Sequence, residues 1–172
     1  LSVQHLADLG HRHIALLNFP SALLEAGYGP AVRFLDGFQA AVAERGLQGV
    51  ARSCEPTLEC GYETIQTLLE EHPSLSAVVT ANDRIPAGVI QALHDKGVRI
   101  PNDFSIVAKV PSRIAEMMTP PLTAVDVPTG ELGRIGAEML IRQLEGEEEQ
   151  PMQLVLSPKL TVRQSSGPYS RR

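Results

Sequence analysis

The chain contains 172 residues, of which 43% are hydrophobic, 20% are charged and 4% are aromatic, and its formal net charge is −5 at pH 7. This length supports one substantial hydrophobic core. The composition argues against several functions. The negative charge gives the chain no general attraction for nucleic acid, and the lack of tryptophan disfavours a carbohydrate site built on tryptophan stacking. No apolar run approaches the roughly 20 residues of a membrane helix.

Hydrophobic spacing and turn residues predict alternating helices and strands in the first part of the chain. Residues 2–9 have the pattern of the last turns of a helix that stops at Gly10, so we expect a segment to precede Leu1. The elements expected after it are a buried strand at 13–17, a loop at 18–30, a helix at 32–45, a weak strand at 47–53 and a helix at 61–71.

The stretch 77–107 is predicted to form a strand–helix–strand unit around which the rest of the chain is organised. Its first apolar run is followed by the helix-capping residues Asn82 and Asp83 and by apolar residues at helical spacing, and a second apolar run begins at Phe104. Such a unit is long enough for a right-handed parallel crossover. Open α/β sheets bind ligands outside the carboxyl ends of their strands, where Asn82, Asp83 and Arg84 would lie.

The remaining elements complete an alternating pattern, which predicts an α/β fold with a mostly parallel sheet flanked by helices. They are a short helix at 112–118, a strand at 122–127, a helix at 129–144 with Thr129 as its N-cap, an acidic turn at 145–150, and two short strands at 152–156 and 159–162 that form a hairpin-like ending. The residues expected in the core are Ile14, Leu16, Val78, Val79, Val89, Ile90, Leu93, Ile106 and Val107.

No motif in the sequence supports catalysis. A nucleophile elbow (G-x-S-x-G), a phosphate-binding loop and a dinucleotide-binding glycine pattern are all absent from the sequence. His5, His11 and His13 are not spaced like metal ligands, so we expect no metal site, no cofactor and no enzymatic activity. Cys54 and Cys60 are expected to be reduced thiols in a cytoplasmic protein, and a disulfide between them remains an alternative.

Asn82 is the first candidate for a ligand-binding residue. Its amide both donates and accepts hydrogen bonds, which suits the hydroxyl groups of a polyol, and the alternative is that it only caps the following helix. Asp83 is more typical of a helix cap. Arg84 and Arg33 either face the crevice at the strand ends or lie on the surface, and the sequence leaves both alternatives open.

Five segments, taken in order, resemble the LacI/GalR family of transcriptional regulators. They are LGHRHIALL at 9–17, GFQAAVAERG at 37–46, ANDRIPAG at 81–88, ALHDKGVRIPNDFSIV at 92–107 and PPLTAVDVPTGELG at 120–133. Each segment is weakly diagnostic alone, but the combination is specific. The resemblance implies two α/β lobes similar to those of periplasmic sugar-binding proteins, a small effector in the cleft between the lobes, and a preceding helix-turn-helix that reads operator DNA.

By this resemblance the chain is the C-terminal half of such a regulator. The implied division assigns 1–127 to the C-terminal lobe, 128–146 to a helix that crosses to the missing N-terminal lobe, 147–166 to a return into the C-terminal lobe, and 167–172 to a tail. The apolar positions of the crossing helix would then pack on the N-terminal lobe.

Two departures from the family's pattern bear on the effector. Phe34 stands where the family usually has an arginine, with Arg33 one position earlier, and Lys109 and Val110 stand where it usually has an aromatic and an acidic residue. The ligand-binding residues expected from the sequence are Asn82, Arg84, Arg33, Phe34, Lys109 and Val110. The charges of Arg84 and Lys109, with Phe34 and Val110 as apolar wall, predict an anionic or partly apolar effector, such as a sugar acid or sugar phosphate. The alternative is that both cations point to solvent and the missing lobe supplies most polar contacts.

The function expected from the sequence is a ligand-responsive, DNA-binding transcriptional regulator of the LacI type. It would form a homodimer, bind operator DNA through a helix-turn-helix outside this chain, and have no association with a membrane. The alternative is a periplasmic-type sugar-binding protein of a transporter, which a signal peptide upstream would favour. The segment 112–118, with Ile114, Met117 and Met118, is a candidate dimer interface, and its alternative role is to pack on its own sheet.

Overall fold

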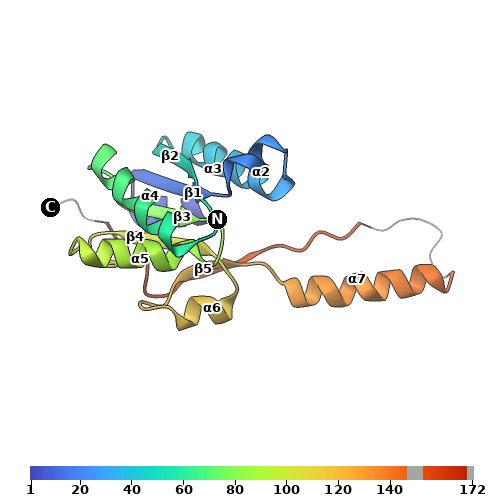
Figure 1. Ribbon diagram of the computed structural model, residues 1–172. Coiled ribbons are helices and arrows are strands. Elements are labelled where there is room, and N and C mark those ends of the chain that lie inside the picture. The colour runs from blue at the N-terminus through green and yellow to red at the C-terminus, as the bar shows by residue number, and fades with distance from the viewer. Residues whose placement is uncertain (147–152, 170–172) are drawn as a thin grey trace.

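The computed structural model describes residues 1–146 and 153–169, which form a six-stranded sheet with helices on both faces (Figure 1). The strands are β1 (His13–Asn18), β2 (Gln48–Ser53), β3 (Ala77–Thr80), β4 (Ser105–Lys109), β5 (Thr123–Asp126) and β6 (Lys159–Thr161). Their order in the sheet is β2-β1-β3-β4-β5-β6. Neighbours from β2 to β5 are parallel, and β6 is antiparallel to β5. The predicted α/β fold with a mostly parallel sheet is therefore confirmed.

Helices cover the two faces of the sheet and enclose two core clusters. The helices are α1 (Ser2–Asp8), α2 (Ser21–Glu25), α3 (Gly29–Glu44), α4 (Leu58–Glu71), α5 (Ile85–Asp95), α6 (Ser112–Met117) and α7 (Thr129–Leu144). On one face, α1 and α3 pack over a cluster that includes Leu16 and Phe38. On the other face, α4 and α5 pack against each other over a cluster that includes Ile65 and Ile106.

The residues predicted to form the core are buried, with one partial exception. Side chains alternate along a strand, so β3 directs Val78 into one cluster and Val79 into the other. Burial on both faces explains why these strands read as continuous apolar runs rather than alternating ones. Ile90 is only half-buried and packs against the cluster beneath α4 and α5.

The starts of α4 and α5 lie in close contact through two glycines. A Cβ atom at Gly61 would lie 2.5 Å from the carbonyl oxygen of Ile85, and one at Gly88 would lie 1.9 Å from the carbonyl oxygen of Leu58. Only glycine permits the two backbones to approach this closely. The contact fixes the start of α5, and with it the loop that follows β3, against the start of α4.

Several helices begin earlier than the sequence pattern predicts. The region expected to be a loop at 18–30 contains α2, and α3 begins at Gly29 with Pro30 in its first turn. Similarly, α4 begins at Leu58, because the Thr57 hydroxyl accepts a hydrogen bond from the Cys60 N–H (3.1 Å) and caps the helix. Prolines and capping residues at helix starts carry little of the apolar periodicity, so the predictions placed these starts too late.

The hairpin predicted near the C-terminal end is wrong. Residues 153–158 contain no strand, and Met152 lies outside the described residues, as does most of the predicted acidic turn. Instead, β6 pairs with β5 and places Thr161 opposite Ala124. The preceding Pro158 has no N–H to donate to a hairpin ladder, whereas β5 would otherwise leave its outer backbone groups unpaired at the sheet edge.

Helix α7 extends away from the sheet (Figure 1). None of its residues is buried, and the side chains of Leu132, Leu140, Ile141 and Leu144 are 42% to 79% exposed. The predicted N-cap is wrong: Thr129 lies inside the helix, and no side chain caps its start in the described structure. Among the described helices, none combines the length and the apolar content that crossing a membrane requires.

The segment predicted as a candidate dimer interface forms α6. Ile114 and Met118 are partly buried and pack against the core cluster of their own sheet. Met117 is 76% exposed. Of the three apolar residues that drew attention to this segment, Met117 is thus the one that lies open on the surface.

Candidate functional site

The carboxyl ends of four neighbouring strands form a continuous row of polar residues. Asn18 ends β1, Thr80 ends β3 and is followed closely by Asn82, Lys109 ends β4, and Asp126 ends β5. We call these five residues the polar edge. Open α/β sheets bind their ligands outside this edge, in the crevice beyond the strand ends.

Asn82 uses the two ends of its amide differently. Its Oδ1 accepts hydrogen bonds from the backbone N–H groups of Arg84 (3.0 Å) and Ile85 (3.1 Å), so the oxygen caps the start of α5. Its Nδ2 is buried and has no hydrogen-bond partner within the described residues. The oxygen therefore serves as a helix cap, as one interpretation of the sequence predicted, and ligand binding through the nitrogen stays a prediction. Asp83 is exposed.

Three buried side-chain atoms of the polar edge lack a hydrogen-bond partner within residues 1–146 and 153–169. They are Asn18 Oδ1, Thr80 Oγ1 and Asn82 Nδ2. Asn18 Nδ2, in contrast, donates to the carbonyl oxygen of Ala31 (3.1 Å) and ties the start of α3 to the end of β1. Buried polar atoms almost always have partners. The three atoms are an acceptor, a hydroxyl and a donor whose hydrogen-bonding capacity is unused within the described residues.

Two cations lie at the strand ends: Lys109, which belongs to the polar edge, and Arg84, which follows Asn82 closely. Arg84 is exposed, Lys109 is half-buried, and in the described structure neither forms an ion pair or a side-chain hydrogen bond. Lys109, Val110 and Asp126 border a cavity of about 80 Å³ between the ends of β4 and β5. The Asp126 carboxylate accepts a hydrogen bond from the Ser112 N–H (3.1 Å). Val110 is only 2% exposed and belongs to the core cluster beneath α4 and α5, so it forms an apolar wall of this cavity.

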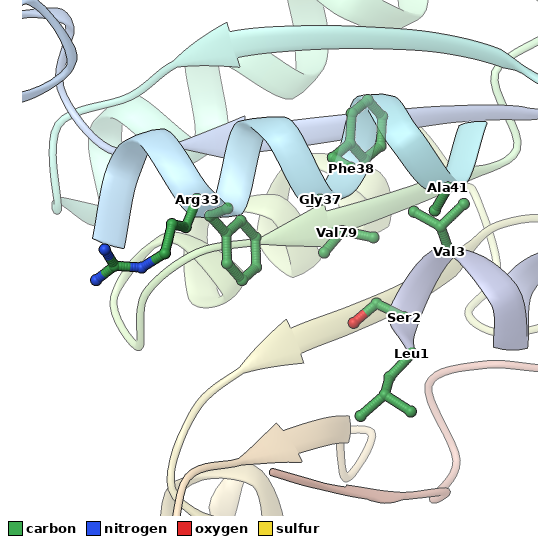
Figure 2. A pocket seen from close by; sticks show the side chains of 9 residues that line it. Leu1, Ser2, Val3, Arg33, Gly37, Phe38, Ala41 and Val79 are labelled. Carbon is green, nitrogen blue, oxygen red and sulfur yellow. The ribbon is translucent and has the colours of Figure 1, made fainter. Parts of the chain in front are cut away.

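Arg33 and Phe34 lie in a different place, on α3. Both line a groove of about 180 Å³ between α1 and α3, whose floor includes Val79. Figure 2 shows the Arg33 side chain pointing away from Val3 and Ala41, past the start of the helix. Phe34 is half-buried against the core cluster under α3. The six predicted residues therefore do not share one pocket: Asn82, Arg84, Lys109 and Val110 lie at the strand ends, and Arg33 and Phe34 lie along the neighbouring groove.

Three residues of the polar edge were not predicted from the sequence: Asn18, Thr80 and Asp126. Each is the last residue of an apolar strand, in HIALLN, AVVT and TAVD. A search for the polar residue that ends each apolar run would have found them. Their common edge, however, depends on the strand order, which the sequence pattern alone does not give.

His11 has a structural role at the opposite end of the sheet, where the strands begin. His11 is buried, with Nδ1 2.9 Å from the Ser76 hydroxyl and Nε2 2.9 Å from the Ser105 hydroxyl, and its ring stacks on Tyr169. Burial lowers the pKa of His11 to about 4, so the ring is neutral at pH 7. No group of three or more metal-ligating side chains occurs in the described part of the chain. His11 thus joins the starts of β1, β3 and β4 through hydrogen bonds.

Comparison with known proteins identifies relatives of this chain. The chain is 32% identical over 167 residues to the HTH-type transcriptional regulator CelR of Thermobifida fusca. The matched region covers 95% of this chain and 48% of CelR. It is 31% identical over 169 residues to the ribose operon repressor of Escherichia coli K12, covering 96% and 50% of the two chains. The chain thus spans about half the length of the curated relatives that it matches.

Solved structures of LacI family regulators are also similar to this chain. A LacI family transcriptional regulator from Enterococcus faecium with bound ribose superimposes with a TM-score of 0.84 at 26% identity, covering 98% of this chain and 62% of that chain. The model of the periplasmic binding protein-like domain matches residues 3–166. The chain therefore belongs to the periplasmic binding protein-like domain family, and its homologues over this region are LacI-family regulators.

Proposed function

We propose that the chain is the effector-binding part of a ligand-responsive, DNA-binding transcriptional regulator of the LacI type. One observation carries this proposal: three buried side-chain atoms without partners, on Asn18, Thr80 and Asn82, lie at the sheet edge where open α/β sheets bind ligands. The relatives named above are transcriptional regulators, and one solved neighbour holds ribose, which supports a small polar effector and a role other than catalysis.

The chemistry of the polar edge favours an effector with both hydroxyl groups and a negative charge. Asn18 and Asp126 supply acceptors for hydroxyl groups, and Asn82 supplies a donor. Arg84 and Lys109 supply positive charge without carboxylate partners in the described structure. Sugar acids and sugar phosphates meet both requirements. A charge-assisted hydrogen bond contributes roughly 1.5–3 kcal/mol, so Arg84→Ala would weaken such an effector about 10- to 100-fold.

The rest of the regulator follows from the division expected from the sequence. In this proposal residues 1–127 and 147–166 belong to the C-terminal lobe, and 128–146 form the helix that crosses to the other lobe. The predicted tail at 167–172 is wrong for residues 167–169, because the Gly167 N–H donates to the Ser105 hydroxyl (3.1 Å) and the Tyr169 N–H donates to the Leu9 carbonyl oxygen (2.8 Å). The exposed apolar side chains of α7 support the crossing helix, because such side chains gain free energy when another surface covers them. Arg33 and Phe34 would form an outer wall of the effector cleft.

Regulation would operate through differential affinity. An effector that binds one arrangement of the two lobes more tightly shifts the population toward that arrangement. In a cytoplasmic homodimer with a helix-turn-helix on each subunit, such a shift changes the spacing of the two DNA-reading helices and hence the affinity for a two-fold symmetric operator.

The direct test uses the full-length protein. A panel of neutral pentoses and hexoses, their sugar acids and their phosphate esters is titrated by calorimetry, and affinity for the upstream promoter DNA is then measured by fluorescence anisotropy with and without each compound that binds. The expected result is tight binding of one anionic sugar derivative and a change in DNA affinity of at least 10-fold. Tight binding of a neutral hexose alone would reject the anionic effector, and absence of DNA binding would reject the regulator.

The second candidate function is a periplasmic-type sugar-binding protein that delivers its ligand to a transporter. It is favoured by the match to the periplasmic binding protein-like domain. The reading frame upstream of Leu1 separates the two functions. A basic helix-turn-helix of about 50–60 residues is expected for the regulator, a family-based expectation for a module that docks a recognition helix in DNA, whereas a signal peptide without such a segment would establish the transporter component.

A further inference from the structure

The two cysteines of the chain lie next to each other at the end of β2. Cys54 directly follows β2, and Cys60 lies in the first turn of α4. Their Sγ atoms are 2.6 Å apart, while both residues are free thiols in this structure. A disulfide has an S–S bond of about 2.05 Å, so a small movement would bring these sulfurs into bonding distance.

The two thiols differ in accessibility. Cys54 is 2% exposed, whereas Cys60 is only half-buried, so a dissolved oxidant reaches the sulfur of Cys60 first. Burial, followed by the hydrogen bond with Cys60, raises the pKa of Cys54. The raised pKa keeps the Cys54 thiol protonated and slow to react with a dissolved oxidant, so the first oxidation falls to Cys60. Cys54 can act in a second step because its sulfur already lies against Cys60 Sγ.

The surroundings hold Cys60 in place. The Glu55 N–H donates a hydrogen bond to Cys60 Sγ (3.1 Å), and the Cys60 N–H donates to the capping hydroxyl of Thr57 (3.1 Å). The Thr64 hydroxyl, one turn further along α4, lies 3.6 Å from the same sulfur. These contacts fix the Cys60 side chain toward Cys54, so the pairing of the two sulfurs is built into the start of the helix.

We propose that Cys54 and Cys60 are an oxidation site, in which a hydroperoxide oxidises Cys60 and Cys54 then closes a disulfide. In the first step the Cys60 sulfur attacks one oxygen of the hydroperoxide, the O–O bond breaks, and the products are a sulfenic acid on Cys60 and an alcohol or water. In the second step the Cys54 sulfur loses its proton and attacks Cys60 Sγ, the S–O bond breaks, and the hydroxide leaves as water. The two thiols lose two electrons in total, and the hydroperoxide gains them.

Such a site suits a protein that works among reduced thiols. Disulfides in reducing compartments are mostly transient and report on oxidants. Cysteines that serve this purpose are accessible and lie beside a resolving cysteine, as Cys60 lies beside Cys54. The site adjoins the polar edge, because the Cys54 N–H donates a hydrogen bond to the Asn18 carbonyl oxygen (3.2 Å). Its chemistry does not depend on the identity of the effector.

The test follows the disulfide by mass spectrometry in the full-length protein. No lysine or arginine lies between Arg52 and Arg84, so trypsin releases both cysteines in one peptide, 53–84. After treatment of the reduced, folded protein with hydrogen peroxide and then an alkylating reagent, we expect this peptide to be unalkylated and lighter by two hydrogens. Dithiothreitol should restore two alkylation sites. The control is the same protein unfolded in guanidinium, in which we expect disulfide formation at least 10-fold more slowly.

Single variants test the order of the steps. In Cys54→Ser, peroxide should leave a sulfenic acid on Cys60 that a 1,3-dione reagent captures, and in Cys60→Ser peptide 53–84 should show neither a disulfide nor a dione adduct. The proposal is overturned if the folded wild-type protein keeps both thiols alkylatable, if it forms only disulfides between chains, if closure is no faster in the folded than in the unfolded protein, or if the adduct forms on Cys54 rather than on Cys60.

Discussion

At the scale of single residues, Asn82 shows how much the sequence could tell. Its position after an apolar run suggested both a helix cap and a ligand-binding residue, and the structure assigns the cap to Oδ1 while Nδ2 stays unpaired. Asn18, Thr80 and Asp126 could not be selected in the same way. A polar residue at the end of a strand resembles any loop residue in sequence. Only the folded structure shows that Asn18 Oδ1 and Thr80 Oγ1 are buried without a partner in the described residues, and that Asp126 ends a strand of the same row.

His11 gives a prediction at this scale about pH and stability. Burial lowers its pKa to about 4, below the ordinary value of 6.5. The unfolded chain therefore binds a proton at a higher pH than the folded chain does, and stability must fall as the pH decreases from about 6.5 to about 4. We expect the free energy of unfolding, measured by urea denaturation, to decrease over this range less steeply in His11→Gln than in the wild-type protein.

The matched control for His11 is His94→Gln. His94 lies on the surface of α5, with 87% of its side chain exposed. This variant removes an exposed histidine instead of a buried one, so its slope of stability against pH should stay closer to that of the wild type than the slope of His11→Gln does. Equal slopes for wild type and His11→Gln would show that the buried ring is not what couples protonation to folding.

At the scale of elements, the strand–helix–strand unit at 77–107 was predicted well because its signals are local: β-branched runs for β3 and β4, and helical spacing with a glycine stop for α5. The predictions were poorer where the element depends on a distant partner. β6 exists because β5 presents a free edge, and α2 follows Pro20 in a segment that has no strong periodicity. The spacing of apolar residues predicts neither the pairing of β6 with β5 nor the presence of α2.

The two glycines between α4 and α5 give the element-scale prediction. In Gly88→Ala the new methyl group would lie 1.9 Å from the carbonyl oxygen of Leu58, which belongs to the backbone and cannot rotate away. The helices must then separate, and overpacking of this kind costs about 1–3 kcal/mol or more. We expect a corresponding loss in the free energy of unfolding, measured by urea denaturation.

Gly37→Ala is the control for Gly88→Ala. Gly37 also lies inside a helix, α3, but a Cβ atom there would have no neighbour within 4 Å. Alanine favours the helix interior by about 0.5–1 kcal/mol over glycine, so this variant should be neutral or more stable. Similar losses in both variants would contradict the proposed role of close helix contact.

At the scale of the whole molecule, the sequence motifs identified the family correctly, and the fold and the homologues agree with them. The placement of the residues proposed to bind the effector was harder to predict, because it depends on which strands are neighbours. For helix α7 the resemblance implied that the apolar residues pack on a lobe outside this chain, and in the structure none of the residues of α7 is buried. The partner that would cover them is part of the proposed two-lobed protein.

The assembly gives the prediction at this scale. We expect the full-length protein to be a homodimer, because a regulator that reads two half-sites of an operator needs two-fold symmetry. Static light scattering at micromolar concentration should give twice the mass of one full-length polypeptide. Met117→Glu tests whether the exposed apolar side chain of α6 takes part, and a monomeric wild-type protein at this concentration would contradict the homodimer.

The central claim is that the polar edge binds the effector, and Asn82→Asp tests it most directly. Aspartate keeps a side-chain oxygen for capping α5, so folding should be preserved, but it replaces the unpaired Nδ2 donor with an acceptor. The control Asp83→Asn makes the reverse exchange at the exposed neighbouring position. The measurement is the calorimetric affinity of the full-length protein for the tightest-binding compound of the sugar-derivative panel. We expect Asn82→Asp to weaken binding at least 10-fold while the variant stays folded, with a lower melting temperature because a carboxylate oxygen replaces a buried, unpaired amide nitrogen. Asp83→Asn should bind like the wild type, and unchanged affinity in Asn82→Asp would contradict the claim.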